Sequence, residues 1–253
     1  MIVACCQLDI AWEDKDANYA KVRALVQADP PPRGSLLLLP EMFATGFSMD
    51  VARIAEGATC ATESFLAALA RDFGLFVLGG LVTAQGDGRG RNQAVAFDPE
   101  GRQLARYCKL HPFSFGSEDR HYAPGEDVVT FEWSGVKVAP FVCYDLRFPE
   151  VFRTAVRRGT QLYAVIANWP SAREAHWSAL LRARAIENQA YVAGVNRCGS
   201  DPRLAYSGRS LIFDPRGECL AEAGGGEGLV RAVVDLPALL DYRQTFPALA
   251  DMR

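Results

Sequence analysis

Val136-Lys-Val-Ala-Pro-Phe-Val142 is a mostly apolar run that leads directly into Cys143 and the segment CYDLRFPEVFR, residues 143–153. A short run of this kind predicts a buried strand, and the residues after it predict a helix. A thiol at that junction faces the unpaired N–H groups and the positive end of the helix dipole, which favour the nucleophilic thiolate. Unpaired cysteine is also among the most buried residue types, so a simple packing role is the alternative.

Two further predicted elements end in charged side chains. The apolar run Leu36–Leu39 is followed by Pro40 and Glu41, which places a carboxylate at the end of a strand. The run Gln103–Lys109 ends in an amine and is followed by His111. Three separate elements therefore terminate in an acid, a cation and a thiol.

The composition predicts one large globular domain. Apolar residues make up 49% of the 253 residues, which is enough for a sizeable core, and we expect a single domain over residues 1–253 with a polar C-terminal tail from about residue 237. The formal charge of −3 argues against nucleic acid as a partner, and no apolar run approaches the roughly 20 residues needed to cross a membrane. Seven cysteines without regular spacing, and a strand pattern that starts at Met1 without a charged leader, favour a reducing, cytoplasmic setting.

Short apolar runs alternate with helical patterns, which predicts an α/β fold with sheets covered by helices. The expected strands are Ile2–Leu8, Leu36–Leu39, Leu75–Leu81, Ala94–Phe97, Leu104–Cys108, Val128–Phe131, Val136–Val142, Leu162–Ala167 and Tyr191–Val195, with a last hairpin of Leu211–Phe213 and Leu229–Val234. The expected helices are Asp16–Ala28, Thr62–Phe73, Pro149–Arg158 and Ala172–Asn188.

The helix expected over Ala172–Asn188 has two further signals. Ser171 followed by Glu174 is a capping-box pattern at its start. Its apolar face carries Trp177, Leu180, Leu181 and Ala185 at helical spacing. That face serves either the chain's own core or a contact with a second subunit.

Polar residues follow several of the expected strands. In parallel sheets, ligands bind beyond the carboxyl ends of the strands. Here those ends carry Glu41, Cys143, Asn168-Trp169 and Asn196-Arg197. We therefore expect these residues to form the floor of one pocket.

Three sequence blocks resemble those of a known protein family. PEMFATGF around Glu41, YCKLHPF around Lys109 and CYDLRFPE around Cys143 resemble the signature blocks of the nitrilase (carbon–nitrogen hydrolase) superfamily, in the same order. Residues 166–199 and the segment YSGRSLIFDPRGE resemble its omega-amidase branch, and the resemblance runs from about Val3 to Phe246. It implies a four-layer αββα sandwich of the nitrilase type, paired across helices as a homodimer or higher homo-oligomer.

The thiol, the carboxylate and the ammonium suit acyl transfer from nitrogen. Glu41 is the expected general base, which takes the proton of Cys143 and passes it to departing ammonia. Lys109, together with the N–H of Tyr144, is expected to stabilise the oxyanion. The thioester formed on Cys143 is then hydrolysed by water.

A second glutamate is expected near this set. The segment GSEDRHYAPG resembles the family loop whose glutamate positions the lysine and the substrate, which assigns that role to Glu118. The alternative is that Glu118 belongs to a solvated acidic pair with Asp119.

Selectivity for an omega-amide needs a cation that binds the distal carboxylate of the substrate. Arg173 and Arg147 are the candidates, because guanidinium binds carboxylate through two parallel hydrogen bonds. Arg147 has an alternative partner in Glu150. Trp169 is a candidate pocket wall with core packing as its alternative.

Other motifs carry little weight. Arg184 and Glu187, three residues apart, are expected to form a structural ion pair. No metal motif and no phosphate-binding glycine loop is present, so we expect neither a metal nor a cofactor. A cysteine–histidine dyad with His111 or His121 is the alternative catalytic arrangement.

The leading function is an amidase for the terminal amide of a small 2-oxo dicarboxylic acid, such as 2-oxoglutaramate or 2-oxosuccinamate. A deaminated glutathione amidase, or another aliphatic amidase or nitrilase, is the nearest alternative. A catalytically silent binding protein and a redox-sensing thiol protein are alternatives from other classes. The intact Glu41, Lys109 and Cys143 argue against a silent site.

Overall fold

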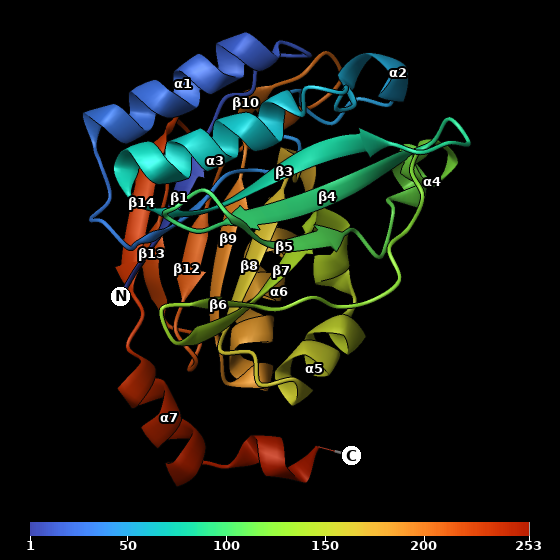
Figure 1. Cartoon of the computed structure of the whole chain (residues 1–253). Coiled ribbons are helices and arrows are strands. Elements are labelled where there is room, and N and C mark those ends of the chain that lie inside the picture. The colour runs from blue at the N-terminus through green and yellow to red at the C-terminus, as the bar shows by residue number, and fades with distance from the viewer. Residues whose placement is uncertain (253) are drawn as a thin grey trace.

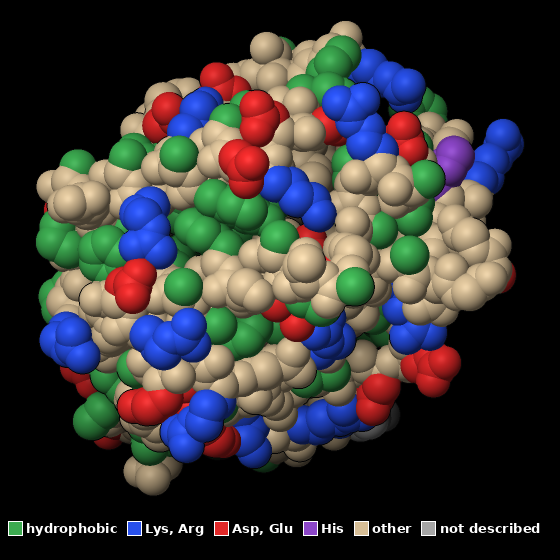
Figure 2. All heavy atoms as spheres, turned by 45° about the horizontal axis from the view of Figure 1, so that its top comes forward, with side chains coloured by type: hydrophobic (Ala, Val, Ile, Leu, Met, Phe, Trp, Pro, Cys, Tyr) green, Lys and Arg blue, Asp and Glu red, His purple; other side chains and the backbone are tan. Residues whose placement is uncertain are grey.

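The computed structural model of the protein describes residues 1–252. Two six-stranded sheets pack face to face, and helices cover the outer side of each sheet (Figure 1). This arrangement is the four-layer αββα sandwich that the family resemblance implies. On the face shown in Figure 2, acidic and basic side chains are interspersed among apolar ones, without a continuous surface of one sign.

The first sheet has the strand order β14-β1-β2-β3-β4-β5. Strands β1, β2 and β3 run parallel, and every other neighbouring pair is antiparallel. The strands are β1 (Ile2–Gln7), β2 (Leu36–Leu38), β3 (Phe76–Ala84), β4 (Gly90–Phe97), β5 (Gln103–Cys108) and β14 (Gly228–Val233).

The second sheet has the order β13-β12-β9-β8-β7-β6, with β7, β8 and β9 parallel at its centre. The strands are β6 (Phe131–Trp133), β7 (Val136–Val142), β8 (Leu162–Ala167), β9 (Tyr191–Asn196), β12 (Leu211–Phe213) and β13 (Cys219–Glu222). A separate two-stranded ribbon joins β10 (Cys198–Ser200) and β11 (Ala205–Ser207). The carboxyl ends of β7, β8 and β9 therefore lie together along one edge.

The longer helices form the outer layers of the sandwich. Helices α1 (Lys15–Ala28) and α3 (Ala61–Phe73) cover the first sheet, and α5 (Pro149–Arg157) and α6 (Glu174–Asn188) cover the second (Figure 1). Shorter helices are α2 (Val51–Ile54), α4 (Glu118–His121) and the C-terminal α7 (Leu236–Thr245). Single 3₁₀ turns occupy Ser114–Gly116, Cys143–Arg147, Ser171–Arg173 and Ala248–Asp251.

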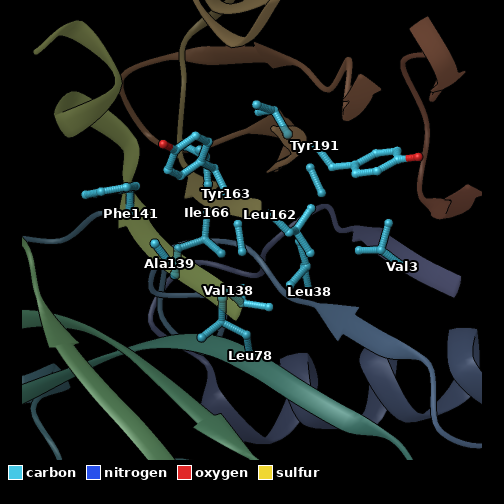
Figure 3. Packing of buried hydrophobic residues seen from close by; sticks show 14 of the residues in the cluster. Val3, Leu38, Leu78, Val138, Ala139, Phe141, Leu162, Tyr163, Ile166 and Tyr191 are labelled. Atoms are coloured by element: carbon cyan, nitrogen blue, oxygen red, sulfur yellow. The ribbon is translucent and has the colours of Figure 1, made fainter. Parts of the chain in front are cut away.

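The main core lies between the two sheets. Val3, Leu38 and Leu78 from the first sheet meet Val138 and Ile166 from the second, and all five are fully buried (Figure 3). Strands buried on both faces read as continuous apolar runs, which is why β7 and β8 have the bounds expected from the sequence, whereas β3, β4 and β6 do not. This packed interior fixes the strand ends, and Lys109 and Cys143 follow directly after β5 and β7, while Glu41 lies in the turn after β2.

Strand β14 does not form the predicted hairpin. Leu211–Phe213 (β12) pairs with β9 and with the unpredicted strand β13, whereas β14 runs antiparallel to β1 in the other sheet. The apolar pattern of Leu229–Val234 indicates a strand, but it carries no information about a partner more than 200 residues away.

The C-terminal tail and the start of α6 also differ from the predictions. Helix α7, Leu236–Thr245, has Asp235 as its N-cap. It is held by Arg243, whose guanidinium donates to Gln189 O at 2.9 Å and Thr160 O at 2.8 Å. The predicted capping box is absent because Ser171 lies in a 3₁₀ turn. Helix α6 begins at Glu174, whose carboxylate pairs instead with Arg209 at 3.0 Å.

Candidate active site

Glu41 lies in the turn after β2 and is fully buried. Its Oε1 accepts from Lys109 Nζ at 2.9 Å and from Asn92 Nδ2 at 2.7 Å, and its Oε2 accepts from the N–H of Asn168 at 2.9 Å. Gly80 on β3 allows the turn to lie this close, because a Cβ there would lie 2.7 Å from Glu41 Cα. The carboxylate is thus fixed by donors from three different elements.

Lys109 follows β5 and has a 1% exposed side chain. Its Nζ lies 2.8 Å from Glu118 Oε2 and 2.9 Å from Glu41 Oε1, so that the amine sits between two carboxylates. Burial alone lowers the pKa of a lysine, but Glu118 and Glu41 outweigh it and raise the pKa of Lys109 well above its usual value. Lys109 is therefore a fixed cation and not a base.

Glu118 begins the short helix α4 and is fully buried, whereas Asp119 beside it is exposed. Its Oε2 accepts from Lys109 and also from the N–H of Phe113 at 2.6 Å. Burial raises the pKa of Glu118, and the charge of Lys109 opposes that rise. The alternative of a solvated acidic pair is wrong, because Glu118 has no contact with solvent.

Cys143 follows β7 in a left-handed backbone conformation, with φ of 48°. Its Sγ lies 3.9 Å from the carbonyl oxygen of Asn168. Burial raises the pKa of the thiol well above its usual value, the charge of Glu41 adds to that rise, and Lys109 opposes it. The thiol keeps its proton until a base removes it.

The predicted activation of Cys143 by a helix dipole is therefore wrong. The residues after Cys143 form only a five-residue 3₁₀ turn, and α5 starts later, at Pro149. A single short turn has few aligned peptide dipoles, so burial and the neighbouring carboxylates dominate the pKa of the thiol.

Asn168 follows β8 and binds Glu41 through its backbone and its side chain. Its Nδ2 donates to Glu41 O at 2.7 Å, beside the bond from its N–H to the carboxylate. At the end of β9, Asn196 binds the backbone of Trp169, with its Oδ1 2.7 Å from Trp169 N. Arg197 is fully buried and donates to Ser200 O and Ile10 O. Asn196 and Arg197 therefore brace the site and do not form the pocket floor.

A pocket of about 410 Å³, its open mouth included, contains Cys143. Its lining residues are Phe47, Phe113, Cys143, Tyr144, Arg147, Asn168, Trp169, Pro170, Arg173, Leu204 and Tyr206. The structure thus brings every predicted substrate-binding residue to one hollow beside the thiol.

The two arginines of the pocket have aromatic neighbours and no acidic partner among residues 1–252. The Arg147 guanidinium lies 4.8 Å from the centre of the Trp169 ring, and its Nη2 lies 3.2 Å from His176 Nδ1. The Arg173 guanidinium lies 5.5 Å from the centre of the Phe113 ring. The alternative pairing of Arg147 with Glu150 is not formed. Both positive charges remain available to an anionic ligand.

Two other sequence inferences concern residues near the site. Arg184 and Glu187 form the predicted ion pair, with 3.0 Å between Nη1 and Oε1, and Arg184 also donates to Leu146 O at 2.7 Å. His111 binds Asp145 at 2.9 Å and stacks on Phe148, while His121 is exposed. Neither histidine forms a dyad with Cys143 in the described part of the chain.

Asn92 is the site residue that the sequence does not reveal. It lies on β4, is 1% exposed and donates to both Glu41 and Glu118. The only signal was a polar pair, Asn92-Gln93, next to the apolar run that predicts this strand.

Among residues 1–252, no group of three or more His, Cys, Asp or Glu side chains is arranged to hold a metal ion. Nor does any helix in that range have the length and apolar character that a bilayer span requires.

The αββα sandwich, with a glutamate, a lysine and a cysteine at its strand ends, defines a hydrolase of the nitrilase superfamily. The chain belongs to the carbon–nitrogen hydrolase family, whose model matches residues 2–244. It is therefore an enzyme, and its relatives place it among the amidohydrolases of that superfamily.

Two curated relatives and one solved structure are similar over nearly the whole chain. The 2-oxoglutaramate amidase of Bacillus subtilis is 34% identical over 99% of this chain and 97% of its own length. The omega-amidase YafV of Yersinia enterocolitica is 39% identical, covering 97% of this chain and 94% of its own. The crystal structure of XC1258 from Xanthomonas campestris, described as a CN-hydrolase superfamily protein with an arsenic adduct in the active site, has a TM-score of 0.91 at 34% identity and covers 100% and 97% of the two chains.

Proposed function

We propose that this enzyme releases ammonia from the terminal amide of a small 2-oxo dicarboxylic acid monoamide, 2-oxoglutaramate or 2-oxosuccinamate. The observation that carries the proposal is the pair of arginines without acidic partners, Arg147 and Arg173, in the pocket of Cys143. A buried or half-buried cation without an anion is costly, and a substrate carboxylate supplies the missing charge. The names of the similar amidases support the same substrate class.

The first half of the reaction forms a thioester. Glu41 removes the proton of Cys143, and the thiolate attacks the amide carbon. The negative charge that develops on the carbonyl oxygen is stabilised by Lys109 and the N–H of Tyr144. Glu41 then gives its proton to the leaving nitrogen, the carbon–nitrogen bond breaks, and ammonia departs.

The second half hydrolyses the thioester. A water molecule gives a proton to Glu41 and attacks the acyl carbon, and the same oxyanion donors stabilise the intermediate. The carbon–sulfur bond breaks, the proton returns from Glu41 to Cys143, and the 2-oxo acid leaves. Glu118 holds Lys109 in place throughout, and this role is supported by the two contacts between its carboxylate and the ammonium.

The distal carboxylate of the substrate binds Arg173, with Arg147 as the second cation. Guanidinium offers two parallel N–H groups to a carboxylate, which fixes the orientation of the substrate as well as its position. Trp169 forms the wall that Arg147 stacks upon. The amide at the other end of a short acyl chain then lies at Cys143.

A deaminated glutathione amidase is the second candidate, and one observation favours it. A wider outer hollow shares Phe47, Phe113, Arg173 and Leu204 with the pocket, and the 85% exposed Phe115 stands at its rim. A longer substrate would extend from the pocket into this hollow.

Ammonia release from 2-oxoglutaramate, 2-oxosuccinamate, deaminated glutathione, glutamine and simple nitriles separates these possibilities. We expect the two 2-oxo monoamides to have the highest kcat/KM. Arg173→Ala should lower kcat/KM for them by about 10- to 150-fold relative to a neutral short amide, since one charge-assisted contact is worth about 1.5–3 kcal/mol. A higher kcat/KM for deaminated glutathione would select the second candidate, and equal rates for charged and neutral amides would contradict both.

We further propose a homodimer or higher homo-oligomer that works in the reducing cytoplasm. The predicted apolar stripe of α6 faces the chain's own core, where Trp177 and Leu181 are fully buried. The outward face of α6, with Ala179, Ala183 and the 49% exposed Ile186, is the surface that supports a subunit contact. All seven cysteines are unpaired, as a reducing compartment requires.

A further inference from the structure

Asn92 contacts Glu41, Lys109 and Glu118. Its Nδ2 lies 2.7 Å from Glu41 Oε1 and 2.9 Å from Glu118 Oε1. Its backbone oxygen accepts from the N–H of Lys109 at 2.9 Å. One residue of β4 thus connects the general base, the second glutamate and the lysine.

The orientation of the Asn92 amide follows from its neighbours. Both nearby side-chain atoms are carboxylate oxygens, which accept hydrogen bonds only, so the NH₂ group must face them. Each hydrogen of that group then serves one carboxylate. The Oδ1 on the other side is buried and has no hydrogen-bond partner in the described chain. A buried acceptor left without a partner is costly, which indicates that the two donated bonds are what this side chain supplies.

We propose that Asn92 is a positioning residue of this enzyme, which holds the carboxylates of Glu41 and Glu118 side by side and ionised around Lys109. The inference rests on the proposed role of Glu41 as the general base. Two buried carboxylates this close repel each other, and the single charge of Lys109 cannot neutralise both. The Asn92 amide stabilises the charged form of each acid without bringing in a further charge.

The other groups that face Glu41 and Glu118 have different roles. Lys109 supplies the one positive charge, and Asn168 donates to the second oxygen of Glu41. Tyr122, at the end of α4, donates to Ser48 O, and burial raises its pKa, so it remains neutral. The Cys143 thiol is also neutral at rest, because burial raises its pKa. Asn92 donates to both glutamates as Lys109 does, but it does so as a neutral side chain.

The expected effect of losing Asn92 is a shift in pH dependence. Hydrogen bonds to a carboxylate favour its charged form, so losing the Asn92 donors favours the protonated form of this carboxylate pair. Asn92→Leu keeps the branched shape of the side chain and removes the donors, and Asn92→Ala removes the side chain with less risk of overpacking. In both variants the acid limb of the pH profile should move up by about one pH unit.

Gln93→Leu is the matched control. Gln93 is the next residue of β4, is 5% exposed and points away from the site, where its amide binds Arg106 and Thr83. The substitution removes a buried amide from the same strand but no hydrogen bond to either glutamate. Its acid limb should stay at the wild-type pH even though its stability falls.

Two profiles are measured for wild type and the three variants. One is kcat/KM for 2-oxoglutaramate against pH, and the other is the rate of Cys143 alkylation by iodoacetamide against pH, which needs no substrate. A wild type that does not hydrolyse 2-oxoglutaramate would count against the proposed substrate, while the alkylation profile would still report on Asn92.

The proposal predicts that both Asn92 variants shift the acid limb upward in the alkylation profile and that Gln93→Leu does not. It is overturned if the limb keeps its wild-type midpoint while the rate falls at every pH, or if Gln93→Leu shifts it equally. If neither Asn92 variant folds while Gln93→Leu does, Asn92 is a core residue and the proposal fails.

Discussion

In the proposed mechanism, Cys143 needs Glu41 to remove its proton before it can act as a nucleophile. The thiol is protonated at rest, since burial and the charge of Glu41 raise its pKa. In the proposed mechanism, the same carboxylate that holds the proton on sulfur accepts that proton when the thiol reacts. In this account the nucleophile depends on an adjacent base and not on a helix dipole.

The reactivity of Cys143 should therefore depend on Glu41. A general base contributes about 10²–10⁴-fold, so Glu41→Gln should slow alkylation of Cys143 by iodoacetamide by at least about 100-fold. The exposed Cys60 is an internal reference in the same sample, because it lies outside the site. Peptide mass spectrometry against time gives both rates. Faster alkylation of Cys143 in Glu41→Gln would mean that Glu41 acts only as a repelling charge, and would refute its role as the base.

At the scale of the elements, the turn that carries Glu41 is pressed against the middle of β3. A Cβ at Gly80 would lie 2.4 Å from Met42 N and 2.7 Å from Glu41 Cα. Both are backbone atoms, which cannot rotate away as the end of a side chain can. Met42 itself has a φ of 44°. Glu41, the proposed base, is therefore positioned by a close backbone approach that only glycine permits.

Gly80→Ala should displace Glu41 and lower the rate of ammonia release far more than the loss of unfolding free energy alone would. A shift of about 1 Å at a reacting group can cost roughly 100-fold in rate, and overpacking costs about 1–3 kcal/mol of unfolding free energy. Gly79→Ala is the control, because the atoms nearest to a Cβ there belong to the side chains of Leu66 and Phe43 and not to the backbone. Ammonia release and urea unfolding are compared for the two variants. Equal losses of activity in both would show that Gly80 has no special relation to Glu41.

The sequence predicts the elements of the site better than their partners. The apolar runs before Glu41 and Cys143 predict buried strands, because strands buried on both faces are continuously apolar. The polar residue after each run then predicts a functional group at the end of the strand. The pairing of β14 with β1 is not predictable in this way, since it joins the two ends of the chain. The role of Asn92 is equally hidden, because its function depends on two glutamates that only the fold brings to it.

At the scale of the whole molecule, each sheet buries one face in the core and the other under helices. The outward face of α6 remains open in a single chain, and its small residues Ala175, Ser178, Ala179 and Ala183 lie beside Arg182 and Ile186. Small side chains let two helices approach closely, which supports the expected pairing of subunits through this layer.

We expect a mass of at least twice the chain's 27.6 kDa in solution. Ala179→Arg on the exposed face of α6 should shift the protein toward the monomer, because it places a charge in the contact. Ala20→Arg, on the exposed side of α1 over the other sheet, should leave the oligomer intact. Light scattering at micromolar concentration reports both. A wild-type mass near 27.6 kDa would refute the dimer without affecting the chemistry at Cys143.

Formation of a thioester on Cys143 is the central step of this account. Wild-type enzyme mixed with 2-oxoglutaramate, quenched in acid within the first turnover and analysed by peptide mass spectrometry tests it most directly. We predict that the peptide containing Cys143 gains one 2-oxoglutaryl group and that hydroxylamine removes it. Release of ammonia in that first turnover with no acyl group on Cys143, or with the group on another residue, would contradict the account.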